Sequence, residues 1–383
     1  MIIVAGFIFS IGAGFFKEGV KTCIKNGVFA AKLPSAMDSS MARQVSAGVL
    51  CDYISMQPGD NVYFLTQRKI YGVGKLIKIG DSGSCITKNY PSAHILDTIN
   101  EIPLGETGII EGPPEFRWVC YFEPEGQFFE TGVDMDDVLL YRPHAFRMLR
   151  AFQDRSFIKI DDEENRALKE YIYLANKSEG KIFEFNSDFH MRAQSFDLSD
   201  YEVTASDTIS LMRSPATGEV ALEMLVEAAV LEELKKENGA FGKWDYISHQ
   251  VIASPFKPIS YIDKIDVFAY RFLAAYPGED KPIEKYLIFE LKKGKANRAT
   301  VLQAMRYVDW VCKEYAAGDY SRVEAKIVAH SYTRNILKET EDDRTRHFIS
   351  TTHPIVSASW NELKLYSYAV SDDGYIEFTE QQQ

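Results

Sequence analysis

An acidic and a basic side chain alternate where a long apolar run ends, within residues 286–293. The run Tyr-Leu-Ile-Phe is followed by Glu290, Leu291 and Lys292. Successive side chains of a β-strand point to opposite faces, so Glu290 and Lys292 share one face while Leu291 points into the core. A continuous apolar run is typical of a central strand. The pattern therefore predicts a reactive carboxylate–ammonium pair at the edge of a sheet.

A second carboxylate, Asp266, lies upstream in the strand-like segment 261–270. It precedes Glu290 by 24 positions (290 minus 266), and the turn Pro-Gly-Glu-Asp at 277–280 separates the two segments. The strands would pair as a hairpin and bring both carboxylates to one metal ion. Mg²⁺ prefers oxygen ligands and keeps several waters. Asp266, Glu290 and the main-chain carbonyl of Leu291 therefore suffice for a hydrolytic site that takes Mg²⁺ or Mn²⁺.

Basic residues at and after this strand fit phosphate chemistry. Lys292 would orient the attacking water or help to deprotonate it, and would stabilise charge on a phosphate. Lys293, Lys295 and Arg298 could hold phosphates nearby, although a solvated turn before a helix explains them equally well. The net charge of −12 argues against passive coating of nucleic acid, because such binding relies on clustered lysine and arginine. A nucleic-acid site would have to be locally basic.

Three parts of this region resemble the PD-(D/E)XK nuclease superfamily, and they are most similar to its RecB-like branch. They are Asp266 after an isoleucine, the Glu-Leu-Lys of residues 290–292, and Gln303 four positions before Tyr307. The resemblance covers about residues 215–335. It implies a metal-dependent nuclease.

The resemblance also implies a role for each matched position. The aspartate and the glutamate would bind Mg²⁺, the lysine would assist the water, and Gln303 would lie beside the site on the next helix. A glutamate of the preceding helix would add to the metal site, and by position this is Glu227. Glu223, one turn earlier on nearly the same face, is the open alternative.

The elements that would position these residues alternate as helix, three strands, helix and strand. Helical apolar spacing distinguishes the helices from the short apolar runs of the strands. The order αβββαβ predicts a mixed sheet with helices packed on it. The expected ranges are 219–237 and 296–315 for the helices, and 246–253, 260–272, 285–293 and 324–331 for the strands.

The first half of the chain is expected to be mainly β and to form a small curled barrel. From residue 48 the pattern turns to strands, and one strand pair would turn at Pro-Glu-Gly 124–126. The expected strands are 2–10, 61–66, 69–79, 116–123 and 127–131, and the expected helices are 15–31 and 152–175.

Residues 56–64, followed by 70–74, resemble the PUA-like superfamily, which includes EVE and related readers. The shared feature is a Gly-Asp turn before a hairpin whose return strand contains glycines. Some domains of that superfamily hold a flipped, modified base between aromatic side chains. Trp118 and Tyr121, together with Phe7, are candidates for such a pocket. The alternative is that they are core residues of the barrel.

The length of 383 residues predicts two domains. A reader domain would span 1–175, a linker 176–215 and the nuclease domain 216–383. The five widely spaced cysteines form no CxxC pair and indicate free thiols in a reducing cytosol. The seven histidines show no HNH or HxH spacing, so each is expected to be structural. The apolar residues 1–16 fit a buried first strand better than a signal peptide or membrane helix.

A reader joined to a nuclease resembles prokaryotic defence systems, either modification-dependent restriction enzymes or Shedu-like nucleases. We therefore expect a cytoplasmic Mg²⁺-dependent DNA endonuclease of anti-phage defence, without membrane association, acting on phage DNA that can include modified bases. Cutting a duplex usually needs two sites, so a homodimer or larger homo-oligomer is expected. Two alternatives stay open: a nucleic-acid-binding protein without cleavage, and a repair or RNA nuclease of the same fold.

Overall fold

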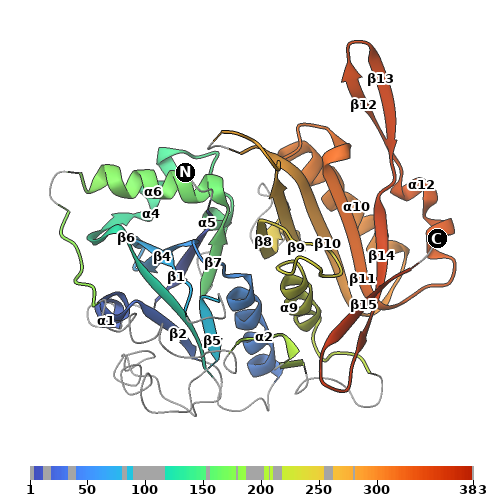
Figure 1. The fold of residues 1–383 in the computed structure, drawn as a ribbon. Helices are drawn as coiled ribbons and strands as arrows, with labels where there is room; N and C mark the ends of the chain where they lie inside the picture. Colours follow the sequence, from blue (N-terminus) through green and yellow to red (C-terminus); the bar gives the residue numbers. More distant parts are fainter. Residues whose placement is uncertain are drawn as a thin grey trace. The chain divides into compact units, whose positions relative to one another are not determined.

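The computed structural model describes residues 4–11, 19–32, 40–79, 84–88, 117–151, 156–177, 180–186, 202–206, 208–209, 218–253, 262–278 and 281–381. The chain divides into two compact units, Ile2–Val203 and Thr204–Gln383. We call them the N-terminal and the C-terminal unit and describe each by itself (Figure 1).

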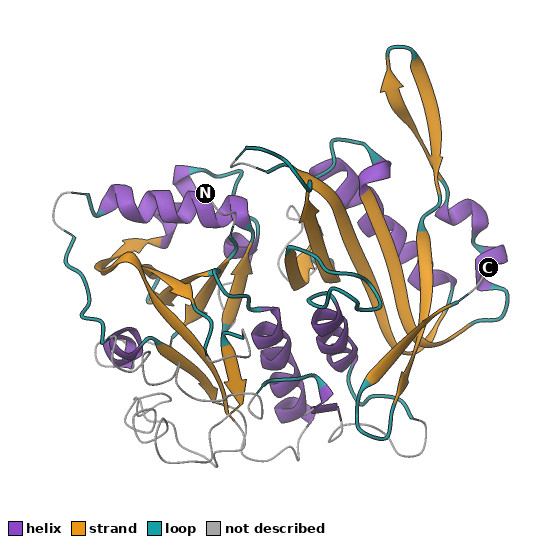
Figure 2. Cartoon of the chain, in the orientation of Figure 1, coloured by secondary structure: helices purple, strands orange, loops and turns teal. Residues whose placement is uncertain are grey.

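A seven-stranded sheet forms the centre of the N-terminal unit (Figure 2). Its order is β2-β6-β4-β3-β1-β7, with β5 also paired to β6. The strands are β1 Gly6–Ser10, β2 Val28–Lys32, β3 Asn61–Thr66, β4 Lys69–Leu76, β5 Ile86–Lys88, β6 Arg117–Asp134 and β7 Phe157–Ile160. The helices are α1 Gly19–Asn26, α2 Ser40–Ser55, α4 Met135–Tyr141, α5 Met148–Ala151 and α6 Asp162–Ala175.

Aromatic rings and one buried ion pair hold this sheet together. The ring centroid of Phe9 lies 5.5 Å from that of Phe64 and 5.2 Å from that of Phe157, both edge to face. Lys159 Nζ lies 3.7 Å from Asp60 Oδ2, and both side chains are buried. Because Lys159 belongs to β7, the pair ties the Gly-Asp turn before β3 to the far edge of the sheet.

Strand β6 differs from the expected strand pair. It runs unbroken through Pro124–Gly126, which forms an irregularity in the ladder instead of a turn. Strand β4 pairs along both halves, with Gly74 opposite Pro124 and Gly72 opposite Phe129. Gly126 has φ +75°, a backbone conformation that glycine adopts without strain. The turn expected at residues 124–126 is wrong, because strand β4 pairs with β6 on both sides of these residues.

The helices of the N-terminal unit also differ from expectation. The helix expected over 15–31 is observed as α1, after which Gly27 (φ +62°) precedes β2. Helix α2 covers residues for which strands were expected from 48 onward. The helix expected over 152–175 starts only at Asp162, because Asp161 caps it by accepting the Glu164 N–H at 2.9 Å. Residues 15–18 and 152–155 lie outside the described residues.

The C-terminal unit is built on a six-stranded sheet of order β15-β14-β11-β10-β9-β8. Its first elements are α9 Glu223–Glu233, β8 Tyr246–Ile252, β9 Lys264–Phe272, β10 Ile283–Ala296, α10 Arg298–Glu314, η5 Tyr320–Arg322 and β11 Val323–Tyr332. The remaining ones are α11 Ile336–Glu339, α12 Glu341–Arg344, β12 Arg346–Thr352, β13 Ile355–Trp360, β14 Leu363–Val370 and β15 Ile376–Glu380. Strands β12 and β13 form a separate two-stranded hairpin that projects from the unit (Figure 1).

The expected mixed α/β architecture of this unit is confirmed. The order α9-β8-β9-β10-α10-β11 repeats the expected αβββαβ order. Strands β9 and β10 are antiparallel, with Val267 opposite Phe289 and Phe268 opposite Ile288. Strand β11 is parallel to β10, and α10 makes the crossover between them. No helix in the described ranges combines the length and apolar character that a membrane-spanning helix needs.

Candidate active site

Glu290 is a buried carboxylate in the middle of β10. Its residue is 1% exposed, and neither side-chain oxygen has a hydrogen-bond partner among the described residues. Lys292 Nζ lies 2.7 Å from Glu290 Oε1 and forms an ion pair with it. Burial raises the pKa of Glu290 to about 7, against the opposing effect of Lys292. The strand thus places a carboxylate inside the unit with the Lys292 ammonium beside it.

The hairpin brings Asp266 to the same place. Its Oδ2 accepts a hydrogen bond from the main-chain N–H of Leu291 at 2.7 Å. Burial raises the pKa of Asp266 well above its usual range, and the charges of Glu290 and Glu227 raise it further. Since three neighbouring carboxylates repel one another, the site holds less than its full negative charge unless a cation enters.

Glu227 reaches this group from α9. The residue is 2% exposed. Its Oε1 accepts a hydrogen bond from Gln250 Nε2 at 2.8 Å, and its Oε2 lies 3.2 Å from His249 Nδ1. Both partners belong to β8. Gln250 was not expected to be a site residue, and His249 was expected to be structural, because no residue type or spacing in β8 marks them.

Glu223 occupies a different position from Glu227. Its Oε1 accepts from Lys292 Nζ at 3.4 Å, and its Oε2 accepts from the Lys293 main-chain N–H at 3.1 Å. Lys292 Nζ also donates to the Leu291 carbonyl at 2.7 Å. Glu223 therefore holds the lysine and the end of β10, while Glu227 faces Asp266. This difference separates the two helix glutamates that the sequence left open.

Gln303 and Tyr307 form a pair on α10. Gln303 Nε2 donates to the Tyr307 hydroxyl at 3.1 Å. Burial raises the pKa of Tyr307 to about 12, with smaller contributions from the charges of Glu290 and Asp266. The charges of the site carboxylates thus act on Tyr307, and its hydroxyl stays protonated near neutral pH. The capping box of Asn297 fixes where α10 begins.

The three candidate phosphate-binding residues have different surroundings. Lys293 and Lys295 are exposed near the C-terminal end of strand β10. Lys293 Nζ donates to the Ala221 carbonyl at 3.2 Å. Arg298 is bound through two nitrogens to Asp343, at 2.8 and 3.2 Å. Arg298 therefore already has an anionic partner within the unit, and the lysines are the more available cations.

Trp118 and Tyr121 are core residues of the N-terminal unit. Trp118 is 6% exposed and Tyr121 is fully buried, with its hydroxyl 2.9 Å from Thr87 Oγ1. Phe7 is fully buried as well. Rings in such positions are closed off from a nucleic acid. They fit the expected alternative, that these residues belong to the core, better than they fit a binding pocket.

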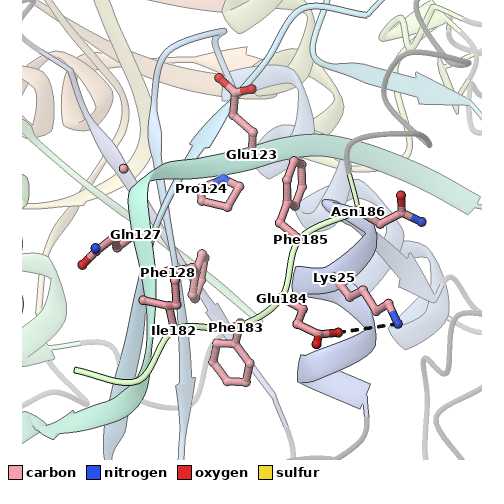
Figure 3. A pocket seen from close by; sticks show the side chains of 11 residues that line it. Lys25, Glu123, Pro124, Gln127, Phe128, Ile182, Phe183, Glu184, Phe185 and Asn186 are labelled. Carbon is pink, nitrogen blue, oxygen red and sulfur yellow. Dashed lines mark ion pairs between the residues drawn. The ribbon is translucent and has the colours of Figure 1, made fainter. Parts of the chain in front are cut away.

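A cavity of about 670 Å³ lies elsewhere in the N-terminal unit. Figure 3 shows Phe128 of β6 with Phe183 and Phe185 around it, and Lys25 of α1 paired with Glu184. The Lys25 Nζ to Glu184 Oε2 distance is 4.0 Å, and both side chains are largely exposed. The volume lies within the usual range for small-molecule sites.

No protein-family model and no curated protein matches the chain. Among solved structures, a repair endonuclease from Pyrococcus abyssi is 24% identical, with a TM-score of 0.21; the match covers 30% of this chain and 43% of that one. A hypothetical protein from Leishmania major is 13% identical at TM-score 0.26, covering 45% of this chain and 95% of that one. The EndoMS–dsDNA2 complex is 12% identical at TM-score 0.19, covering 83% and 94%. Likenesses this low carry no argument, so function rests on the site itself.

Proposed function

We propose that the C-terminal unit is a Mg²⁺-dependent endonuclease that hydrolyses phosphodiester bonds of DNA. The observation that carries this proposal is Glu290, a buried carboxylate whose two oxygens have no hydrogen-bond partner among the described residues. Asp266 lies beside it and has Glu227 as a further acidic neighbour, and Lys292 forms an ion pair with Glu290. Lys292 offsets the charge at Oε1, whereas Oε2 has no partner among the described residues, and leaving a buried acceptor unpaired is costly unless a ligand takes it up.

The donor set fits Mg²⁺ or Mn²⁺. Hard cations take carboxylate and carbonyl oxygens, and the group offers Glu290, Asp266 Oδ1 and the Leu291 carbonyl. The Leu291 carbonyl already accepts from Lys292 and keeps a second lone pair. When bound, such an ion lowers the pKa of a coordinated water and neutralises charge on a phosphate.

The chain's own groups orient the reaction. Lys292 is held by Glu290, Glu223 and the Leu291 carbonyl, so its ammonium has a fixed position beside the carboxylates. From there it can donate a hydrogen bond to a water or to a phosphate oxygen. Tyr307 accepts a hydrogen bond from Gln303 and, protonated near neutral pH, keeps its own hydroxyl proton as a second donor.

Incubation with nucleic acids tests this proposal. Plasmid, modified phage DNA, single-stranded DNA and RNA are compared with Mg²⁺ and with EDTA. We expect Mg²⁺-dependent cleavage of DNA that Glu290→Gln abolishes. Glu284→Gln is the matched control, because Glu284 lies on the same strand but is half-exposed and paired with Arg271. Binding without cleavage by the unmodified protein would leave a nucleic-acid-binding protein, and cleavage of RNA alone would change the substrate class.

For the N-terminal unit we propose selection of the DNA target, as the PUA-like resemblance implies. The aromatic cavity of Figure 3 supports a flat ligand such as an extruded base, since Phe183 and Phe185 are half-exposed there. A preference for modified over plain phage DNA should be lost in Phe185→Ala while cleavage of plain DNA continues. A role in anti-phage defence follows from the resemblance and remains a prediction.

A further inference from the structure

Two consecutive residues of β8 contact the same carboxylate. His249 Nδ1 lies 3.2 Å from Glu227 Oε2, and Gln250 Nε2 donates to Glu227 Oε1 at 2.8 Å. In a regular strand, consecutive side chains point to opposite faces of the sheet. If β8 were regular throughout, only one of these two side chains could therefore reach Glu227.

The backbone of Gln250 resolves this conflict. Its φ is +53°, in the left-handed region that residues with a Cβ rarely adopt. The ladder with β9 continues on either side, with His249 opposite Val267 and Val251 opposite Ile265. The unusual conformation is therefore confined to one residue within an intact strand pair. It interrupts the regular alternation of side chains at this point, where both His249 and Gln250 contact Glu227.

The same amide also approaches the second carboxylate. Gln250 Nε2 lies 3.5 Å from Asp266 Oδ1, at the outer limit of a hydrogen bond. The donor group thus stands between Glu227 and Asp266 and bonds firmly to Glu227 alone. It holds one carboxylate in place while leaving Asp266 Oδ1 weakly engaged. Strained residues of this kind persist where the surrounding structure holds them, and they cluster at functional sites.

We propose that His249 and Gln250 form a clamp that positions Glu227 as the third carboxylate of the metal site. The left-handed conformation of Gln250 is what allows two neighbouring residues to act together. Gln250 is a positioning residue, acting through Glu227 rather than on the substrate. The metal part of this inference rests on the proposed function.

Thermal melts of the metal-free protein test the clamp without any metal. Gln250→Gly keeps the left-handed backbone without strain and removes the amide. We expect a lower Tm, because Glu227 then loses its 2.8 Å donor while still buried. In a Glu227→Leu background the same change should leave Tm unchanged or raise it. Ala317→Gly is the matched control, since Ala317 has φ +53° and is exposed, and it should not lower Tm.

A higher Tm for Gln250→Gly in the unmodified background would overturn the clamp. Relief of the backbone strain at Gln250 would then outweigh the loss of its hydrogen bond to Glu227. An equal fall in Tm with and without Glu227 would overturn it too, since the amide would be acting elsewhere.

Calorimetric titration with Mn²⁺ tests the positioning role. Mutation of a residue that orients a metal ligand typically weakens metal affinity by about 10- to 100-fold. Gln250→Gly should therefore weaken Mn²⁺ binding about tenfold or more. In the Glu227→Leu background it should cause no further loss. Equal Mn²⁺ affinity of Gln250→Gly and the unmodified protein would overturn the role. Absence of Mn²⁺ binding by the unmodified protein would overturn it together with the proposed function, and the melts alone would then decide whether the clamp exists.

Discussion

At the scale of single residues, protons and metal ions compete for Glu290. Burial favours the neutral acid, whereas the Lys292 ammonium 2.7 Å away favours the carboxylate. The resulting pKa of about 7 means that the side chain changes charge near neutral pH. A metal ion binds only the deprotonated form. Affinity for metal must therefore increase as pH rises through this pKa.

The first prediction concerns this competition. Mn²⁺ affinity should increase between pH 6 and pH 8 and then level off, with release of protons on binding. Lys292→Met should move the increase to higher pH, because loss of the ammonium raises the pKa of Glu290 further. Calorimetry in two buffers of different ionisation enthalpy measures both affinity and proton release.

Lys293→Met is the control, since the Lys293 ammonium bonds to the Ala221 carbonyl and no contact joins it to Glu290 among the described residues. If the pH dependence of Mn²⁺ affinity is the same in Lys292→Met as in the unmodified protein, the titrating group is not Glu290.

The site residues divide into those that the sequence could predict and those that it could not. Asp266, Glu290 and Lys292 were predictable because strand alternation and one hairpin determine their faces. His249 and Gln250 were not, because their joint contact with Glu227 depends on one left-handed residue inside a strand. Glutamine rarely adopts a left-handed conformation, so a glutamine in the sequence gives no sign of one.

At the scale of elements, the start of α6 concentrates buried acids. Glu164 is fully buried, and its carboxylate accepts the main-chain N–H groups of Met148 at 2.8 Å and Leu149 at 3.3 Å. Burial, together with the charge of Asp161, raises its pKa to about 8. Asp161, the N-cap, has its pKa raised to about 6 by burial. The junction between α5 and α6 thus favours protonated carboxyl groups.

The second prediction follows from the sign of that shift. A carboxyl group whose folded pKa exceeds its unfolded value of 4.5 binds more protons when folded. Stability from Glu164 is thus fully present below pH 4.5 and is lost progressively as pH rises to about 8. Glu164→Gln cannot ionise, so the fall in Tm between pH 5 and pH 8 should be smaller in this variant. Glu163→Gln, at a half-exposed neighbour, should keep the full pH dependence. An unchanged slope in Glu164→Gln would contradict the assignment.

Elements were predictable where one physical signal dominated. Strand β3 has the bounds that its apolar run predicted, and α10 starts two residues after the expected position. Helix α2 was missed because apolar residues lie on most of its circumference, which hides the helical period. The ladder to β4 overrode the Pro-Glu-Gly turn signal in β6. Strands β12–β15 lie after residue 331, where no element was expected.

At the scale of the whole molecule, two compact units share one chain, and the third prediction concerns how many chains act together. Cutting both strands of a duplex usually needs two sites, so the active species should be a homodimer or larger homo-oligomer. Light scattering should then give at least twice the chain mass of 43.5 kDa. A monomer that cuts duplex DNA in both strands at one place would contradict this expectation.

The last prediction joins the site to the stability of the folded protein. A ligand that binds only the folded state raises stability by RT ln(1 + [L]/Kd), so Mn²⁺ at about 100 times its Kd should add about 2.7 kcal/mol. Hydrogen exchange should slow first in α9, β9 and β10, which carry Glu227, Asp266 and Glu290. Glu290→Gln should lose both the rise in Tm and the protection, because an amide cannot replace the charge of the carboxylate, whereas Glu284→Gln on the same strand should keep both. An equal effect in Glu290→Gln, or none in the unmodified protein at millimolar Mn²⁺, would mean that the three neighbouring carboxylates share protons instead of a metal ion.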